Sequence, residues 1–265
     1  MSGLYTEVRG SGPTLALLHG WGLNLRVWDG LAAALGDRLR IVTVDLPGHG
    51  RSEWVPERAS LAAQAEQVHQ AVSAIAGTYS LLGWSLGGQI ALRLAAGLRD
   101  TGAAPLDRLV LVAATPRLGA GPDWPHGAPP QRLQEQAVGL RSDYRRTVSD
   151  FLELQVRGSA GGEAALAQLR AALFAHGEAR PEALAHGLEL LRDTDLRPLL
   201  GGIDRPALVV AGQYDRVTLP AASRALAEAL PNARFVEIRR AAHAPFLSHL
   251  AQVCALIAEF LGEAP

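Results

Sequence analysis

The chain has 265 residues, of which 48% are apolar and 19% charged. This composition excludes a disordered or fibrous protein, and the length suits one large domain or one domain that carries an insertion. The 25 basic residues, all arginine, nearly balance 26 acidic residues, and the net charge is −1. No nucleic acid or other polyanion is therefore expected as a partner.

Apolar segments and the cysteine count predict a soluble cytoplasmic protein. The N-terminus has no apolar segment of signal-peptide length, and no window approaches the ~18 uninterrupted apolar residues of a membrane span. The single cysteine, Cys254, lies in an apolar stretch and is expected to be a packed core thiol. No metal-ligand spacing such as H-E-x-x-H occurs, so no metal is expected. We also expect a monomer, without an organic cofactor and without membrane contact.

Short apolar runs alternate along the chain with amphipathic segments. Most of the runs are continuous rather than alternating, as in parallel strands that are covered on both faces. The alternation with helices is typical of a doubly wound α/β sheet. Residues 4–8, followed by Gly10 and Gly12, predict an antiparallel edge hairpin. The predicted core strands span residues 15–18, 41–44, 80–82, 109–113, 208–211 and 235–238, and the predicted core helices span 26–35, 61–76, 86–98, 221–230 and 250–261.

This alternation stops after Ala114. Residues 119–130, with four prolines and three glycines, predict a linker because such a segment sustains neither a helix nor a central strand. Residues 131–195 then show a helical pattern with breaks at 158–162 and 177–181. An inserted segment of this kind commonly covers the carboxyl ends of the strands, where ligands bind in open α/β sheets. The predicted division is a core of residues 1–116 and 197–265 and a helical cap, or lid, of residues 117–196.

A G-x-S-x-G motif, GWSLG, places Ser85 at a predicted strand-to-helix turn. Its two glycines suit a sharp turn with the helix packed closely against the strand. The helix N-terminus beside the serine offers free backbone N–H groups to an anion. We therefore predict that Ser85 is a nucleophile, and the alternative is a serine that caps the helix.

A serine nucleophile needs a base, and the base needs an acid that holds its tautomer. His243 and Asp215 each follow a predicted strand, at the end of the sheet where catalytic residues belong. His49 is the main alternative base and Asp45 the alternative acid. The segment DLPGHG is interpreted instead as a turn led by Asp45. Surface or packing positions are predicted for His69, His126, His176, His186 and His249.

The negative charge that develops in acyl transfer needs backbone N–H groups directed at it. Leu86, directly after the predicted nucleophile, supplies one such amide. The loop HGWG after the first core strand supplies the other, the N–H of Trp21, because its glycines let the backbone turn inward. His19 in this loop is interpreted as stabilising the loop rather than as a base.

Five motifs, HGWG, DLPGHGRS, GWSLGG, GQYD and AAHAPF, resemble the α/β-hydrolase superfamily in their order and cover nearly the whole chain. The order Ser85, Asp215, His243 is the one expected of that fold. The segments LLHGWGLN, GWSLGGQIA, FLELQ, GLELLRDTDLR and AAHAPFLSH further resemble the pimeloyl-[acyl-carrier protein] methyl ester esterases of biotin synthesis. In that family the enzyme removes a methyl ester from a pimeloyl chain that is bound to its carrier protein.

The resemblance implies an α/β-hydrolase fold and a serine carboxylesterase with the triad Ser85, Asp215 and His243. An acyl ester, free or bound to an acyl-carrier protein, is the implied substrate. Asp150 and Glu163 stand where the family has basic residues, so a docking face for the carrier is only partly kept. The implied substrate-binding residues are Trp21, Phe151, Leu152, Glu153, Leu154, Gln155 and His243, and the implied docking residues are Arg141, Arg145, Arg146, Arg157 and Arg170.

Other functions fit parts of the same sequence. A broad-specificity short-chain carboxylesterase, an enol-lactonase or the menaquinone-pathway lyase would share the core and differ in the cap. A ligand receptor would keep the fold and signal by binding instead of catalysis. A nucleotide-binding Rossmann domain would need G-x-G-x-x-G after the first core strand, where HGWG stands instead.

Overall fold

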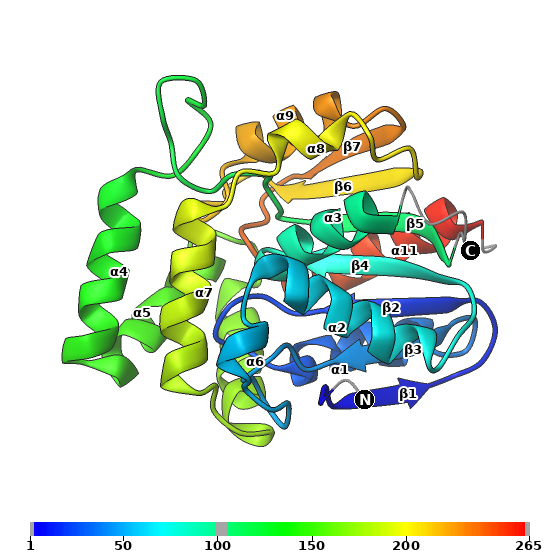
Figure 1. Ribbon diagram of the computed structural model, residues 1–265, viewed down its shortest axis with the longest axis horizontal. Helices are drawn as coiled ribbons and strands as arrows, with labels where there is room; N and C mark the ends of the chain where they lie inside the picture. Colours follow the sequence, from blue (N-terminus) through cyan, green and yellow to red (C-terminus); the bar gives the residue numbers. More distant parts are fainter. Residues whose placement is uncertain (1–2, 99–104, 263–265) are drawn as a thin grey trace.

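The computed structural model describes residues 3–98 and 105–262, apart from the side chains of residues 130, 133, 144, 145, 174 and 175. Within these residues, seven strands form one sheet in the order β1-β3-β2-β4-β5-β6-β7 (Figure 1). The strands are β1 (Thr6–Arg9), β2 (Thr14–Leu18), β3 (Arg40–Val44), β4 (Tyr79–Trp84), β5 (Leu106–Val112), β6 (Ala207–Gly212) and β7 (Ala233–Ile238). The helices that pack on the sheet or join its strands are α1 (Asp29–Leu35), α2 (Leu61–Ser73), α3 (Leu86–Leu98), α8 (Arg197–Leu200), α9 (Pro220–Ala229), α10 (Pro245–Ser248) and α11 (Leu250–Leu261), with 3₁₀ turns at Leu25–Trp28 and Pro56–Arg58.

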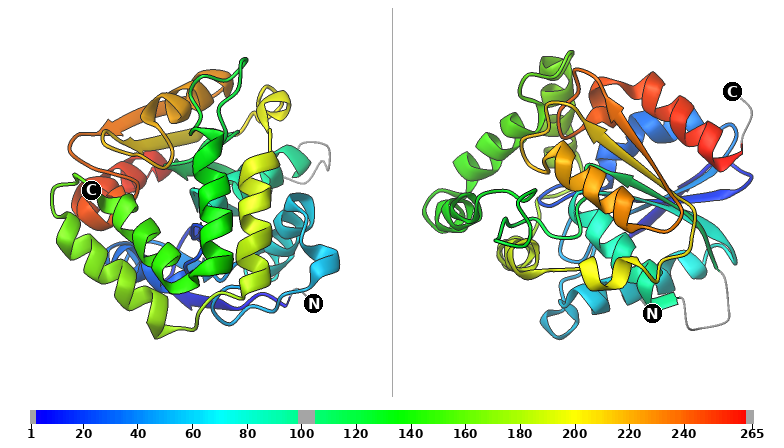
Figure 2. Two further views of the ribbon diagram at one scale, coloured as in Figure 1. Left: turned by 90° about the vertical axis from the view of Figure 1, so that its left-hand side faces the viewer. Right: turned by 90° about the horizontal axis from the view of Figure 1, so that it is seen from above.

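Both faces of the sheet are buried, since its central strands are almost entirely apolar. Leu15 and Leu17 pack in one cluster with side chains of α1 and α11, whereas Ala16 and Leu18 pack in another with α2, α3 and α9. Figure 2 shows these helices on the two faces of the sheet. All strand pairs other than β1 with β3 are parallel. The predicted α/β fold, with a mostly parallel sheet between two helical layers, is confirmed.

The predicted core strands all form, and most extend a residue or more beyond their apolar runs. Of the predicted helices, 86–98 and 250–261 form with the expected bounds, whereas 26–35 begins with a 3₁₀ turn before α1. Cys254 on α11 is buried, as expected of a core thiol. In the described part of the chain, no helix combines the length and apolar character needed to cross a membrane.

The predicted N-terminal hairpin is wrong. β1 is an antiparallel edge strand, as expected, but it pairs with β3 rather than with β2, the next strand in the chain. Gly10 and Gly12, both with positive φ, turn the chain closely past the loop that precedes β3. A Cβ on Gly10 would lie 2.2 Å from the carbonyl oxygen of Gly36. The chain therefore passes β3 before it enters the sheet as β2.

Five helices of the described chain follow β5 and precede β6, and the first four lie beyond the carboxyl ends of the strands (Figures 1 and 2). We call them the cap helices: α4 (Pro130–Ser142), α5 (Tyr144–Val156), α6 (Gly162–Ala175) and α7 (Pro181–Asp193). The proline-rich linker that precedes them forms no helix and only isolated bridges. At the base of the segment, the N–H of Leu196 donates to the carbonyl of Pro116 over 2.9 Å. The sequence did not predict the break between α4 and α5 at Asp143, whose side chain accepts from the N–H of Arg146.

Candidate active site

Ser85 occupies the turn between β4 and α3. Its backbone φ is 55°, a left-handed conformation that residues other than glycine rarely adopt. A Cβ on Gly83 would lie 2.3 Å from the carbonyl oxygen of Gly87, and a Cβ on Gly87 would lie 2.4 Å from that of Leu18. Glycine is therefore required on both sides of Ser85, and the turn has the strained geometry of a nucleophile elbow.

Asp215 and His243 meet across the loops that follow β6 and β7. Nδ1 of His243 lies 2.8 Å from Oδ2 of Asp215, and both side chains are fully buried. Oδ1 of Asp215 accepts from the backbone N–H groups of Val217 and Thr218 at 2.8 and 2.9 Å. Because the carboxylate accepts, the imidazole carries its proton on Nδ1 and presents a lone pair at Nε2. Nε2 is buried and has no hydrogen-bond partner among the residues that the structure describes.

The backbone of His243 is held from both sides. The indole N–H of Trp84, the residue before Ser85, donates to its carbonyl oxygen over 2.9 Å. The N–H of His243 donates to the carbonyl oxygen of Gln155 on α5 over 2.8 Å. The imidazole is thus fixed between the serine turn and a cap helix.

The HGWG loop, residues 19–22, lies directly against the serine turn. A Cβ on Gly20 would lie 3.4 Å from the Cβ of Ser85 and 3.2 Å from the ring of Trp84. Trp21 is 2% exposed, and its indole N–H donates to the carbonyl oxygen of Leu184 on α7 over 2.9 Å. Leu86 is the first residue of α3, so its N–H has no acceptor within the helix. The amides of Trp21 and Leu86 therefore belong to two segments that meet at Ser85.

Ser85 opens into a narrow cavity beneath the cap helices. Its volume is about 20 Å³, roughly the space that one water molecule needs. Trp21 and Phe151 meet at this cavity edge to face, with ring centroids 5.1 Å apart. The cavity is lined by Trp21, Ser85, Leu118, Ala128, Arg132, Gln136, Phe151, Leu154, Leu188, Leu191 and Val217.

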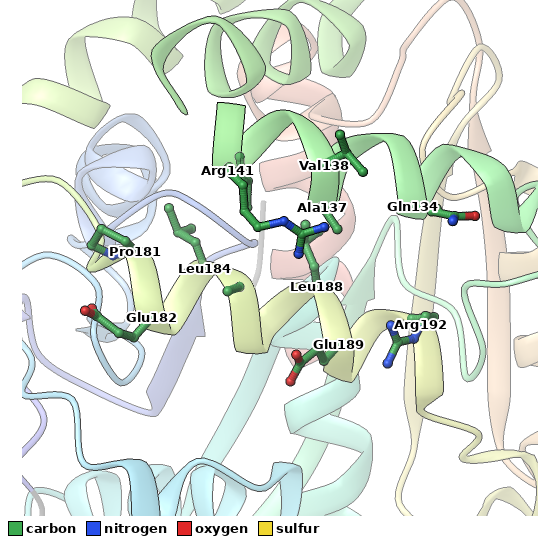
Figure 3. Close-up of a pocket in the computed structure, with 12 residues that line it drawn as sticks. Gln134, Ala137, Val138, Arg141, Pro181, Glu182, Leu184, Leu188, Glu189 and Arg192 are labelled. Carbon is green, nitrogen blue, oxygen red and sulfur yellow. The ribbon is translucent and has the colours of Figure 1, made fainter. Parts of the chain in front are cut away.

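A larger groove lies elsewhere, between α4 and α7 (Figure 3). Its volume is about 840 Å³, its floor is apolar, and Arg141, Glu182, Glu189 and Arg192 lie along it. Ser85 does not line this groove. Leu188 lines both spaces, so this groove of the cap helices adjoins the cavity that holds Ser85.

The alternative acid and base are engaged in other contacts. Asp45 accepts from the N–H groups of Leu25 and Arg51 at 2.8 and 2.9 Å, as expected of a residue that leads a turn. Burial raises the pKa of Asp45, and those two N–H groups oppose the rise. Nε2 of His49 accepts from the N–H of Gly22 at 3.3 Å. Neither side chain joins the pair formed by Asp215 and His243.

The cap residues that the family resemblance singled out divide between three environments. Phe151 and Leu154 line the cavity beside Ser85. Leu152 is buried in the core cluster, and Glu153 forms an exposed ion pair of 2.9 Å with Arg170. Gln155 is buried, and neither amide atom of its side chain has a partner among the described residues.

The predicted docking arginines do not form one cluster of uniform charge. Arg141 lies along the groove between α4 and α7. Arg146 lies 3.7 Å from Asp150 on the same helix, and Arg170 is paired with Glu153. Arg157 is exposed, and the side chain of Arg145 lies outside the described residues.

Sequence reasoning missed several residues of this region. Arg132 and Gln136 enter the cavity from α4, and no local pattern marks them. His176, predicted as a surface or packing residue, is buried, with Nε2 2.9 Å from Oδ2 of Asp45, so it joins the cap helices to the core. Across residues 3–98 and 105–262, no three His, Cys, Asp or Glu side chains gather in a group that could hold a metal ion.

Comparison with known proteins agrees with this geometry. The sequence model of the α/β-hydrolase fold family matches residues 13–250. The chain belongs to the α/β-hydrolase family. A pimeloyl-[acyl-carrier protein] methyl ester esterase from Nitrosomonas europaea is 38% identical over 248 residues, which are 94% of this chain and 95% of the relative. Another from Xanthomonas oryzae pv. oryzae is 39% identical over 262 residues, 99% of this chain and all of the relative.

Solved structures extend the likeness to the whole fold. An esterase from Exiguobacterium antarcticum superposes with a TM-score of 0.88 over 98% of this chain and 96% of its own. Its sequence identity is 21%, so it bears on the fold alone. In this α/β-hydrolase, as the fold requires, Ser85, Asp215 and His243 each follow a strand at the carboxyl edge of the sheet.

Proposed function

We propose that this chain is a serine carboxylesterase that hydrolyses the methyl ester of pimeloyl-[acyl-carrier protein]. The observation that carries the proposal is the buried hydrogen bond between His243 and Asp215, next to the turn that holds Ser85 at positive φ. The relatives named for this reaction support the substrate, since they align with nearly the entire chain, cap helices included.

In the proposed mechanism Ser85, His243 and Asp215 act as a triad. Nε2 of His243 takes the proton of Ser85 as the hydroxyl oxygen attacks the ester carbonyl. The N–H groups of Trp21 and Leu86 bind the oxyanion of the tetrahedral intermediate. His243 then protonates the leaving methanol. Water, deprotonated by the same imidazole, hydrolyses the acyl-enzyme and frees Ser85.

The acyl chain would lie between Ser85 and the cap helices. Phe151 and Leu154 offer it an apolar wall. Gln155, whose backbone carbonyl accepts from the N–H of His243, carries a buried amide without a partner among the described residues. A cavity the size of one water cannot hold a seven-carbon acyl chain. We therefore propose that residues 117–196 act as a cap that shifts to admit the substrate.

We propose that the carrier protein docks on arginines of the cap. Arg146 and Arg170 are exposed, and their ion pairs with Asp150 and Glu153 contribute roughly 0–1 kcal/mol each, so an acidic partner can displace these acids. Arg141 and Arg157 add exposed positive charge. The proposal places the reaction in the cytoplasm, with the chain acting as a monomer.

The test uses purified protein and the methyl ester of pimeloyl-carrier protein, with methanol release as the readout. Wild-type protein should release methanol, and the S85A variant should not. The gene should also rescue a biotin auxotroph that lacks this esterase. Good hydrolysis of simple esters together with failure of both assays would favour a broad-specificity carboxylesterase instead.

A further inference from the structure

Two buried histidines outside the proposed triad lie against the HGWG loop. His19 is within the loop, His49 is in the DLPGHG turn (residues 45–50) after β3, and their ring centroids are 5.2 Å apart. Both side chains are almost inaccessible to solvent. Neither contacts Asp215, so the proposed proton transfers do not use them.

The two rings bind each other's loops reciprocally. Nε2 of His19 accepts from the N–H of Leu46 in the turn at 3.0 Å. Nε2 of His49 accepts from the N–H of Gly22 in the HGWG loop at 3.3 Å. Each ring also donates through Nδ1–H to a carbonyl of its own segment, His19 to Gly20 at 2.8 Å and His49 to Pro47 at 3.0 Å. Both rings therefore have to be neutral, with the proton on Nδ1.

These bonds fix the two peptide groups on either side of Trp21. The carbonyl of Gly20 and the N–H of Trp21 belong to one planar trans peptide, so they point in opposite directions. The bond from His19 to that carbonyl consequently sets the direction of the Trp21 N–H. The next peptide group is set by the bond from the Gly22 N–H to His49. Gly22 has a φ of +77°, a left-handed conformation that glycine adopts without steric cost.

We propose that His19 and His49 form a clasp that orients the Trp21 amide for oxyanion binding, with His49 as the positioning residue on the far side of the clasp. The inference rests on the proposed esterase function. Burial lowers the pKa of His49 to about 4 and that of His19 well below its usual value, so both acceptors persist at neutral pH. His49 touches no substrate and acts through the backbone of Gly22.

The proposal is tested by comparing two replacements of His49. In H49F the ring shape is kept but the acceptor for Gly22 is lost. In H49Q the amide oxygen can accept from Gly22 while the amide nitrogen donates to the carbonyl of Pro47. Loss of an oxyanion donor costs about 10²–10³ in kcat, so misalignment of one should cost H49F about 10- to 100-fold, and H49Q should recover most of that loss.

The readout that separates positioning from general structure is binding of a transition-state analogue. An aliphatic trifluoromethyl ketone forms a hemiketal with Ser85 whose oxyanion occupies the same hole. Its inhibition constant should weaken in H49F by the same factor as kcat/KM, while KM for a p-nitrophenyl ester changes less than about threefold. The matched control is H69F, because His69 lies away from the loop and forms a hydrogen bond of 2.9 Å with the hydroxyl of Tyr79. H69F should change neither the inhibition constant nor kcat/KM more than twofold.

A second variant keeps the test decisive if H49F does not fold. H49N is polar, and its side chain is too short to reach both Pro47 and Gly22, so it should lose kcat and ketone affinity in parallel. The proposal is overturned if H49N or H49F keeps wild-type ketone affinity, or if H49Q is as impaired as H49F. Wild-type activity no higher than that of S85A would refute the esterase function and the clasp together. An active wild type, with the same activity and ketone affinity in the His49 variants, would refute the clasp alone.

Discussion

The N–H of His243 donates to the carbonyl oxygen of Gln155 over 2.8 Å, and this bond joins the proposed base directly to cap helix α5. A cap that opened as one unit would break the bond and release the backbone of His243. Opening through α4 and α7 would preserve it. The position of the His243 imidazole therefore depends on both the sheet and the cap helices.

Removal of the proposed nucleophile should abolish ester hydrolysis. S85A is expected to lower kcat on the order of 10⁶-fold, as in a serine hydrolase whose triad acts as a unit. D215N should lower it about 10⁴-fold, since the amide no longer holds the Nδ1–H tautomer of His243. Steady-state hydrolysis of a p-nitrophenyl ester measures both. Retention of more than a few per cent of activity by S85A would exclude Ser85 as the nucleophile.

Trp21 should matter to stability and activity, and Trp124 to stability alone. Each indole N–H donates to a backbone carbonyl over 2.9 Å, Trp21 to Leu184 and Trp124 to Arg117. W21F and W124F should each lose about 0.5–1.5 kcal/mol of unfolding free energy, the net contribution of one hydrogen bond, because the Arg117 carbonyl still accepts from the Thr115 hydroxyl and the Leu184 carbonyl lies within helix α7. Only W21F should also lower kcat/KM, by about tenfold, since Trp21 lines the cavity. Equal losses of kcat/KM in the two variants, compared at urea concentrations that leave the same fraction of each folded, would contradict this role of Trp21.

The glycine before Ser85 should tolerate no side chain. In G83A the added Cβ would lie 2.3 Å from the carbonyl oxygen of Gly87, and both backbones are fixed by the sheet and by α3. We expect a loss of at least about 3 kcal/mol, beyond the usual cost of overpacking. G201A is the control: its Cβ meets nothing within 4 Å, and it should be neutral or slightly stabilising. Urea unfolding midpoints compare the two, and similar midpoints would show that the turn can relax.

Acidification should destabilise the protein through His49. The pKa of His49 is about 4 in the folded chain, against 6.5 when exposed. Between those values the unfolded chain binds a proton that the folded chain does not, so stability falls as pH falls below about 6.5. The full effect below pH 4 is roughly 3 kcal/mol. H49Q removes this proton-binding group together with the charge of His49 that helps to lower the pKa of His19, so the difference between the two stability curves reports His49 and its effect on that neighbour. Parallel curves from pH 7 to pH 4.5 would contradict the buried neutral ring.

The sequence predicted the parts of the fold and site that are set locally. Ser85 is marked by the glycines that its turn requires, and Asp215 and His243 each follow a short run of strand length, of which β6 is buried throughout and β7 only at Ile238. The strands themselves are recognisable because burial on both faces demands continuous apolar residues.

The contacts that the sequence could not predict join distant segments. Arg132 reaches the cavity only because α4 lies over Ser85, and His176 meets Asp45 only because the cap helices return to the core. β1 pairs with β3, and the residues of the turn after β1 do not distinguish this pairing from a hairpin with the next strand. None of these contacts produces a periodic or spaced pattern in the sequence.

The hydrogen bond between Leu196 and Pro116 closes the base of the inserted segment beside the sheet. The parallel register of β5 against β6, with Val110 opposite Leu208, is formed entirely outside the segment. A foreign segment grafted here would have to bring its two ends together and to replace the contacts that Gln155, Leu184 and His176 make with the core. New substrate preferences can thus arise by exchange of one module while the reacting groups stay in place.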